Sequence, residues 1–182
     1  TAVVAAVVAA VAAVVAGGWW LQRAGWLTTG RADSATVPPA QLEGLPLVRL
    51  QRGEEALQAI NRLHRTAIEI VDGYVAAYGN AHEQVIVWWA RAASEAKARE
   101  LVDVMTEKMA ASPLFSRPQP VTVGGRRLHF TVGAGMRNYY WVSGQDVYWA
   151  GVVSSREASI VEALLRGVPD DPGPPSADRF PR

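Results

Sequence analysis

The chain has 182 residues, a formal net charge of +1 and no cysteine. The absence of cysteine excludes disulfides, thiolate metal sites, covalent haem attachment and cysteine nucleophiles. A net charge this close to zero gives no electrostatic basis for binding nucleic acid.

The first segment, residues 1–21, carries no charged side chain and consists almost entirely of alanine and valine. At ~1.5 Å of rise per residue, a helix of this length spans about 30 Å, the thickness of the bilayer hydrocarbon core. Trp19, Trp20 and Trp26 follow where an interfacial aromatic belt is expected. We therefore predict a single transmembrane anchor over residues 1–27. The alternative is a cleaved signal peptide, whose apolar core is usually shorter, roughly 7–15 residues, and follows positive charge.

The small residues of this anchor form a row at helical spacing, namely Ala5, Ala9, Ala13 and Gly17. Such rows let a neighbouring transmembrane helix approach closely, although a segment rich in alanine and valine also generates them by chance. We expect packing against other transmembrane subunits, because a lone span of weakly hydrophobic residues has little else to hold it. Short N-terminal anchors usually leave the following domain outside the cytoplasm, so we expect a periplasmic or otherwise extracytoplasmic domain.

The rest of the chain divides into three parts by composition. Residues 28–46 read as a linker because they combine small polar residues with prolines and a glycine. Residues 47–166 form the predicted domain, and about 120 residues are enough to bury a hydrophobic core. Residues 167–182 contain several prolines and are expected to form an irregular tail.

Hydrophobic periodicity predicts helices and strands in alternating groups within the domain. The predicted elements are a helix over 53–65, strands over 68–78 and 84–91, a helix from Ser94 to about Ala111, strands over 121–125, 128–132, 138–143 and 146–153, and a helix over 156–166. We expect a bend or bulge at Gly73, an N-cap at Ser94, and a capping box formed by Ser154 and Glu157.

This order predicts an α+β fold with a mostly antiparallel sheet and helices packed on one face. A ferredoxin-like or related architecture is the nearest common fold. The same periodicity predicts a core made of Ile60, Leu63, Val87, Leu101, Val102, Met105, Leu128, Phe130 and Leu164.

No catalytic constellation stands out in the sequence. His64, His82 and His129 are isolated and lack the spacing of metal ligands, so each is expected to be structural. The glycine-rich stretch 133–136 precedes a strand rather than a helix, so a hairpin turn explains it better than a phosphate loop. We predict no catalytic residue, no metal and no cofactor.

Aromatic residues gather on the strands predicted over 138–143 and 146–153, which form a hairpin, and on the earlier strand over 84–91. They are Trp88, Trp89, Tyr139, Tyr140, Trp141, Tyr148 and Trp149. They form either cross-strand packing or an exposed patch for a partner or the membrane surface. Adjacent strand residues point to opposite faces. Trp88 and Trp89 therefore cannot both enter one core, and we expect at least one exposed tryptophan.

These features favour a non-catalytic accessory or structural subunit of a larger membrane protein complex, in contact with lipid and with other transmembrane subunits. Photosynthetic and respiratory electron-transport complexes are frequent hosts of such one-helix subunits. The alternative is a membrane-tethered extracytoplasmic domain that binds a ligand or acts as a sensor. A pilin-like filament subunit is a third possibility, against which the linker argues.

Overall fold

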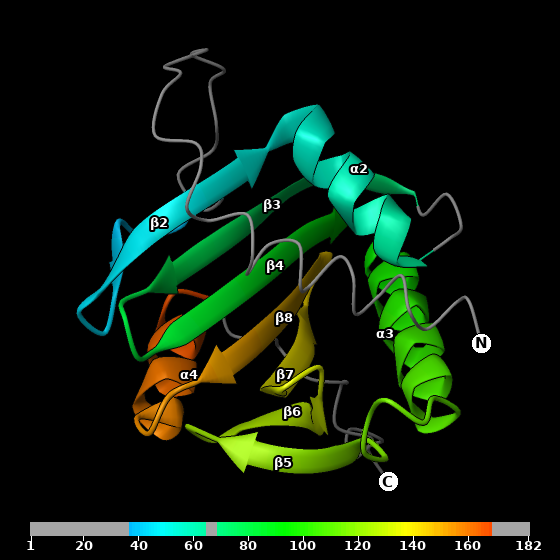
Figure 1. Ribbon diagram of the computed structural model, residues 1–182. Helices are drawn as coiled ribbons and strands as arrows, with labels where there is room; N and C mark the ends of the chain where they lie inside the picture. Colours follow the sequence, from blue (N-terminus) through cyan, green and yellow to red (C-terminus); the bar gives the residue numbers. More distant parts are fainter. Residues whose placement is uncertain (1–36, 65–68, 169–182) are drawn as a thin grey trace, which may run out of the picture.

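The computed structural model describes residues 37–64 and 69–168, apart from the side chains of residues 62–64. Within these ranges the chain forms an α+β domain built on one eight-stranded sheet, in the order β1-β2-β3-β4-β8-β7-β6-β5 (Figure 1). Every pair of neighbouring strands is antiparallel. The predicted class, an α+β domain with an antiparallel sheet, is therefore confirmed.

The domain contains eight strands and three helices in the described residues. The strands are β1 (Gln41–Leu42), β2 (Leu45–Arg52), β3 (Ile70–Gly79), β4 (Gln84–Ala92), β5 (Gln119–Val123), β6 (Arg126–Gly133), β7 (Met136–Ser143) and β8 (Asp146–Val153). The helices are α2 (Gly53–His64), α3 (Glu95–Ala110) and α4 (Glu157–Arg166). None of these helices is long and apolar enough to cross a membrane. The predicted anchor and most of the predicted tail lie outside the described residues.

Helix α3 forms where its sequence pattern predicts it. The Ser94 hydroxyl accepts a hydrogen bond from the backbone N–H of Lys97 at 3.2 Å, which satisfies one of the free donors of the first turn. The helix buries the predicted core residues Leu101, Val102 and Met105, and Ala98 and Met109 complete the same buried stripe.

The β6–β7 and β7–β8 connections are the predicted hairpins. Ala134 and Gly135, between β6 and β7, have φ angles of 55° and 75°. Positive φ at both central residues is the requirement of a type I′ turn, which matches the twist of the flanking strands. The glycine-rich stretch is therefore a hairpin turn and not a phosphate loop.

The helices cover both faces of the sheet, whereas the sequence predicted a single covered face. One apolar cluster unites α4 with strand residues such as Val87 and Val152, and separate clusters on the opposite face contain α3 and α2. The central strands permit this because consecutive residues are apolar: Val85, Ile86 and Val87 are all buried. Such continuous runs are typical of strands buried on both sides.

The domain begins earlier than predicted, because β1 and the start of β2 occupy the range assigned to the linker. Leu42 and Leu45 are only 3% and 1% exposed, so this hairpin belongs to the core. Glu43 and Gly44 form its turn with φ angles of 49° and 79°. Pro46 resembles a linker residue, but a proline is tolerated near the start of an edge strand.

The domain also ends slightly later than predicted. Val168 is 7% exposed, and its backbone oxygen accepts a hydrogen bond from Arg126 Nη2 at 2.8 Å. Val168, the second residue after α4, therefore packs into the core, whereas Gly167 is exposed. The boundary drawn at residue 166 followed the end of the helical pattern rather than the end of the core.

Most of the predicted core is buried. Six of its members are buried, namely Ile60, Val87, Leu101, Val102, Met105 and Leu128. Phe130 and Leu164 are partly buried against the α4 cluster, and the side chain of Leu63 lies outside the described residues. The sheet is larger than that of a ferredoxin-like βαββαβ unit, because a hairpin precedes α2 and a four-stranded meander follows α3.

The irregularity predicted at Gly73 lies slightly earlier in β3. The register with β4 shifts between Ile70 and Asp72, which marks the bulge. Gly73 itself serves close packing, because a Cβ there would lie 2.9 Å from Ile60 Cδ1 and 3.0 Å from the Trp89 backbone oxygen.

Candidate functional site

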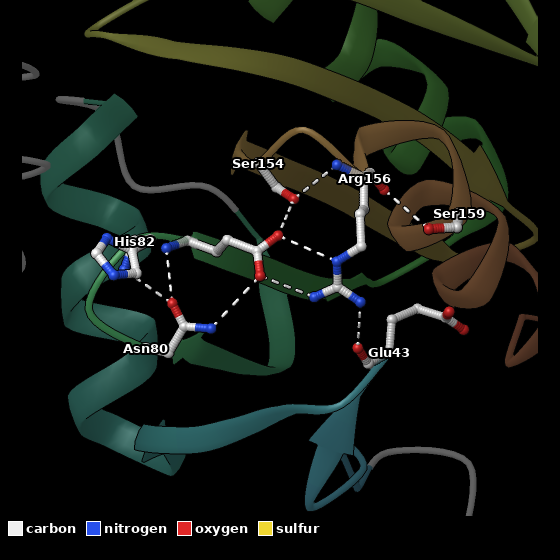
Figure 2. A network of polar contacts seen from close by, with 7 residues as sticks. Glu43, Asn80, His82, Ser154, Arg156 and Ser159 are labelled. Atoms are coloured by element: carbon white, nitrogen blue, oxygen red, sulfur yellow. Dashed lines mark hydrogen bonds and ion pairs between the residues drawn. The ribbon is translucent and has the colours of Figure 1, made fainter.

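A network of polar contacts joins three turns at one end of the sheet (Figure 2). The Arg156 guanidinium donates to both carboxylate oxygens of Glu83, from Nη2 at 2.9 Å and from Nε at 3.2 Å. Its Nη1 donates to the backbone oxygen of Glu43 at 2.8 Å. The Ser154 hydroxyl and the Asn80 amide also donate to the Glu83 carboxylate. The network thus connects the β1–β2 turn, the β3–β4 turn and the segment between β8 and α4.

These contacts keep Glu83 ionised. Hydrogen bonds from Arg156 and Ser154 lower the pKa of this carboxyl to about 2, against a smaller opposing effect of burial. The same pairing raises the pKa of Arg156. A general acid or base needs a pKa near the working pH, and this carboxylate does not have one. The network is therefore a tie between turns rather than a centre of proton transfer.

Ser154 and Glu157 do not form the predicted capping box. Helix α4 begins at Glu157, and its N-cap residue, Arg156, makes no side-chain capping hydrogen bond. The Ser154 hydroxyl belongs to the network above, while Glu157 accepts from the Tyr139 hydroxyl and pairs with Arg137. The prediction was wrong because both side chains have partners that are distant in sequence.

A row of aromatic rings crosses the face of the sheet that α4 covers. The strand register aligns one residue each from β3, β4, β8 and β7, namely Tyr74, Trp89, Tyr148 and Trp141. Tyr74 stacks on Trp89 with ring centroids 5.2 Å apart, and Trp141 stacks on Tyr148 at 5.1 Å. Cross-strand pairs of this kind contribute roughly 0.2–1 kcal/mol each to stability.

A second row lies directly behind the first, on the face that α2 and α3 cover. It contains Trp88, Trp149, Tyr140 and His129. Tyr140 stacks on both Trp149 and His129, with centroid distances of 5.3 Å and 4.8 Å. The Tyr140 hydroxyl lies 2.9 Å from Thr106 Oγ1, so the row is also held to α3.

Two donors of the first row lack an acceptor. The indole nitrogens of Trp89 and Trp141 are buried and have no hydrogen-bond partner in the described part of the chain. Burial raises the pKa of the hydroxyl of Tyr148, which lies between them in the row, and Asp146 and Tyr74 raise it further, whereas Arg91 and the approach of the Trp89 N–H lower it. A buried unpaired donor costs about 1–3 kcal/mol, so both groups are candidates for contact with water or a ligand.

The aromatic residues that were candidates for a partner surface lie mostly in the interior. Five of its seven members are buried: Trp89, Tyr139, Tyr140, Trp141 and Tyr148. Trp88 and Trp149 are half-buried, so the expected exposed tryptophan is absent among the four on these strands. The expectation was wrong because both faces of the sheet are covered, which gives adjacent tryptophans separate cores.

The remaining predicted site residues lie apart or outside the described residues. The partner-helix row, Ala5, Ala9, Ala13 and Gly17, and the interfacial residues, Trp19, Trp20 and Trp26, fall outside them. His82 is exposed in the β3–β4 turn, and the His64 side chain is not described. His129 is half-buried, and its pKa is lowered by burial and by Arg127, with Asp103 opposing.

No group of three or more histidine, cysteine, aspartate or glutamate side chains gathers in a metal-binding arrangement within the described ranges. The sequence also gave no sign of the pairing between Glu83 and Arg156, because the two residues are far apart in the chain. Only Asn80 carried a local signal: its side chain accepts from the backbone N–H of His82 at 2.8 Å and of Glu83 at 2.9 Å, as a turn asparagine does.

No known protein family matches this chain, and no curated protein or solved structure shows significant similarity to it.

Proposed function

We propose that this protein is a non-catalytic accessory subunit of a larger membrane protein complex. A single transmembrane helix over residues 1–27 anchors it, and the α+β domain braces the complex on the extracytoplasmic side. The observation that carries the proposal is the uncharged alanine–valine run of residues 1–21, whose length suits the bilayer and whose small residues suit helix packing.

The contacts within the domain support a structural role. Its best-connected carboxylate, Glu83, is held in an ion pair and has a pKa of about 2. The aromatic residues that could have formed a surface are occupied in two stacked rows. The polar and aromatic side chains thus mainly hold the domain together. A photosynthetic or respiratory electron-transport complex is the host class we propose to examine first.

Extraction of native membranes in mild detergent tests this proposal. The full chain should co-purify with a stoichiometric set of membrane proteins, and washing with high salt should not release it from the membrane. A chain that is extracted as a monomer without partners would contradict the proposal.

The unpaired indole donors favour a second candidate, a membrane-tethered domain that binds a ligand. Oxygen acceptors next to Trp89 and Trp141 would remove the cost of two buried N–H groups. An experimental density map at high resolution distinguishes the two cases. An organic ligand at these nitrogens supports the second candidate, whereas ordered water alone leaves the first as the better account.

A further inference from the structure

The two edges of the sheet differ in how they are protected. At one edge, β5 contains Pro120 and is preceded by Pro118, and prolines remove backbone donors from a free edge. At the other edge, β1 pairs with β2 only as far as Pro46. Beyond Leu47, whose N–H donates to the Ala40 oxygen at 2.9 Å, β2 has no further strand neighbour on its outer side among the described residues.

Three side chains of this open edge are exposed, and two of them are positively charged; Leu50 is half-buried, and the buried Gln51 donates to Glu55 of α2. Val48 is 63% exposed at the bulge where the β2–β3 register shifts. Arg49 and Arg52 are exposed, and neither forms a hydrogen bond or ion pair with a described residue. Together these residues, 48–52, form what we call the β2 edge.

The two arginines of the β2 edge favour an acidic partner strand over a second copy of β2. Two copies of β2 pairing antiparallel about Leu50 would place Arg49 opposite Gln51 and Arg52 opposite Val48, so self-pairing would leave both arginines without a carboxylate partner. An acidic strand would instead neutralise both. Arg49 and Arg52 are three positions apart, so they point to opposite faces of the sheet. A matching strand therefore carries two acidic residues at the same spacing, one toward each face.

We propose that the β2 edge binds an acidic, extended segment of a partner protein by strand addition. Backbone hydrogen bonds would extend the sheet, and the two arginines would select carboxylates three positions apart. The inference rests on the proposed function, because it names how the domain would meet a partner subunit. A bulge and charges at an edge also protect against aggregation, and the test separates this protective role from docking.

The test uses the full chain in detergent and a short fluorescent peptide of threonine and valine with two glutamates three positions apart. Fluorescence anisotropy should show binding that weakens as salt increases. Amide hydrogen exchange should show new protection at residues 48–52. The double variant Arg49→Glu/Arg52→Glu should bind at least about tenfold more weakly, since two attractions become repulsions.

Three controls make the result specific. The variant Arg117→Glu makes the same charge change at an exposed residue before β5 and should alter affinity by less than about twofold. The milder double variant Arg49→Gln/Arg52→Gln should show an intermediate loss of peptide affinity. It replaces the charge-reversed double variant in the test if that variant fails to fold. A lysine version of the peptide should not bind.

Equal binding by wild type and both double variants, protection at β5, or a salt-stable dimer of this chain through residues 48–52 would each overturn the inference. Failure of the proposed function is a separate result. If the chain co-purifies with stoichiometric partners and neither the peptide nor the double variant behaves as expected, the accessory role stands and the β2 edge is only protective.

Discussion

Glu83 shows how one side chain can hold together segments that are distant in the chain. Its carboxylate accepts from Arg156 in the segment before α4 and from Asn80 at the end of its own turn. Arg156 also donates to the backbone oxygen of Glu43. The Glu43 carboxylate in turn forms an ion pair with Arg166 at the end of α4, with an N–O distance of 2.8 Å. The turns at this end of the sheet are therefore linked by the Glu83–Arg156 and Glu43–Arg166 ion pairs and by the hydrogen bond from Arg156 to Glu43.

The first prediction concerns Glu83→Gln. The folded-state pKa of about 2 lies below the ordinary value of 4.5, so the ionised form stabilises the fold above about pH 4.5 and that contribution is lost as the pH falls toward 2. Urea midpoints should be lower for the variant at pH 7, and the difference should shrink at pH 3. The matched control is Glu100→Gln, which removes an exposed pair with Lys97 and should change little.

The second prediction concerns His129, whose pKa is lowered in the folded state. The unfolded chain then binds the proton first, so stability should fall as the pH drops below about 6.5, a window well above that of Glu83. His129→Phe keeps a ring to stack on Tyr140 and should abolish this slope between pH 7.5 and 5.5. A variant that keeps the full wild-type slope would show that another group titrates there.

At the scale of elements, the sequence predicts best where local pattern and burial agree. The core residues Leu101, Val102 and Met105 of α3 and its cap at Ser94 were predicted correctly because helical spacing and capping chemistry are both local. The β1–β2 hairpin was missed because Gly44 and Pro46 look like linker residues until Leu42 and Leu45 are seen in the core. The consecutive apolar residues Val85, Ile86 and Val87 did indicate a strand buried on both faces, but the prediction of a single covered face did not use this signal.

The candidate site was less predictable than the fold. Alternation correctly separated Trp88 from Trp89 onto opposite faces, but it could not say that both faces are covered. The pairing of Glu83 with Arg156 depends on three turns meeting in space, and no local spacing encodes it.

The third prediction tests the close approach of the loop after α3 to the sheet. Phe115 forms a bridge with Gly133 at the end of β6, and a Cβ on Gly133 would clash with the Phe115 ring. Gly133→Ala should therefore lower the free energy of unfolding by about 1–3 kcal/mol, as overpacking does. Chemical denaturation measures this loss.

The control for this substitution is Gly167→Ala. A Cβ there would meet only the Leu164 oxygen at 3.7 Å, an ordinary contact, and the Gly167 φ angle of −83° suits any residue. The free energy of unfolding of the Gly167→Ala variant should change by less than about 0.5 kcal/mol. If both variants lose the same free energy of unfolding, the close contact between Phe115 and Gly133 does not explain the effect of Gly133→Ala.

At the scale of the whole molecule, an α+β domain follows a predicted transmembrane anchor, which lies outside the described residues. The domain is a sheet with both faces covered, tied at one end by the Glu83 network and open along the β2 edge. The proposed accessory role depends on whether the small-residue row of the anchor contacts another transmembrane helix.

Co-purification of two anchor variants tests this central claim most directly. Ala9→Leu/Ala13→Leu makes the anchor more hydrophobic, so insertion should persist, but the added bulk should separate packed helices. Val4→Leu/Val11→Leu adds hydrophobic bulk outside the small-residue row and is the matched control. After extraction in mild detergent, we predict that the alanine variant loses its partner subunits while the valine variant keeps them. Full retention of partners by both variants would contradict the claim and would show that the small-residue row is accidental.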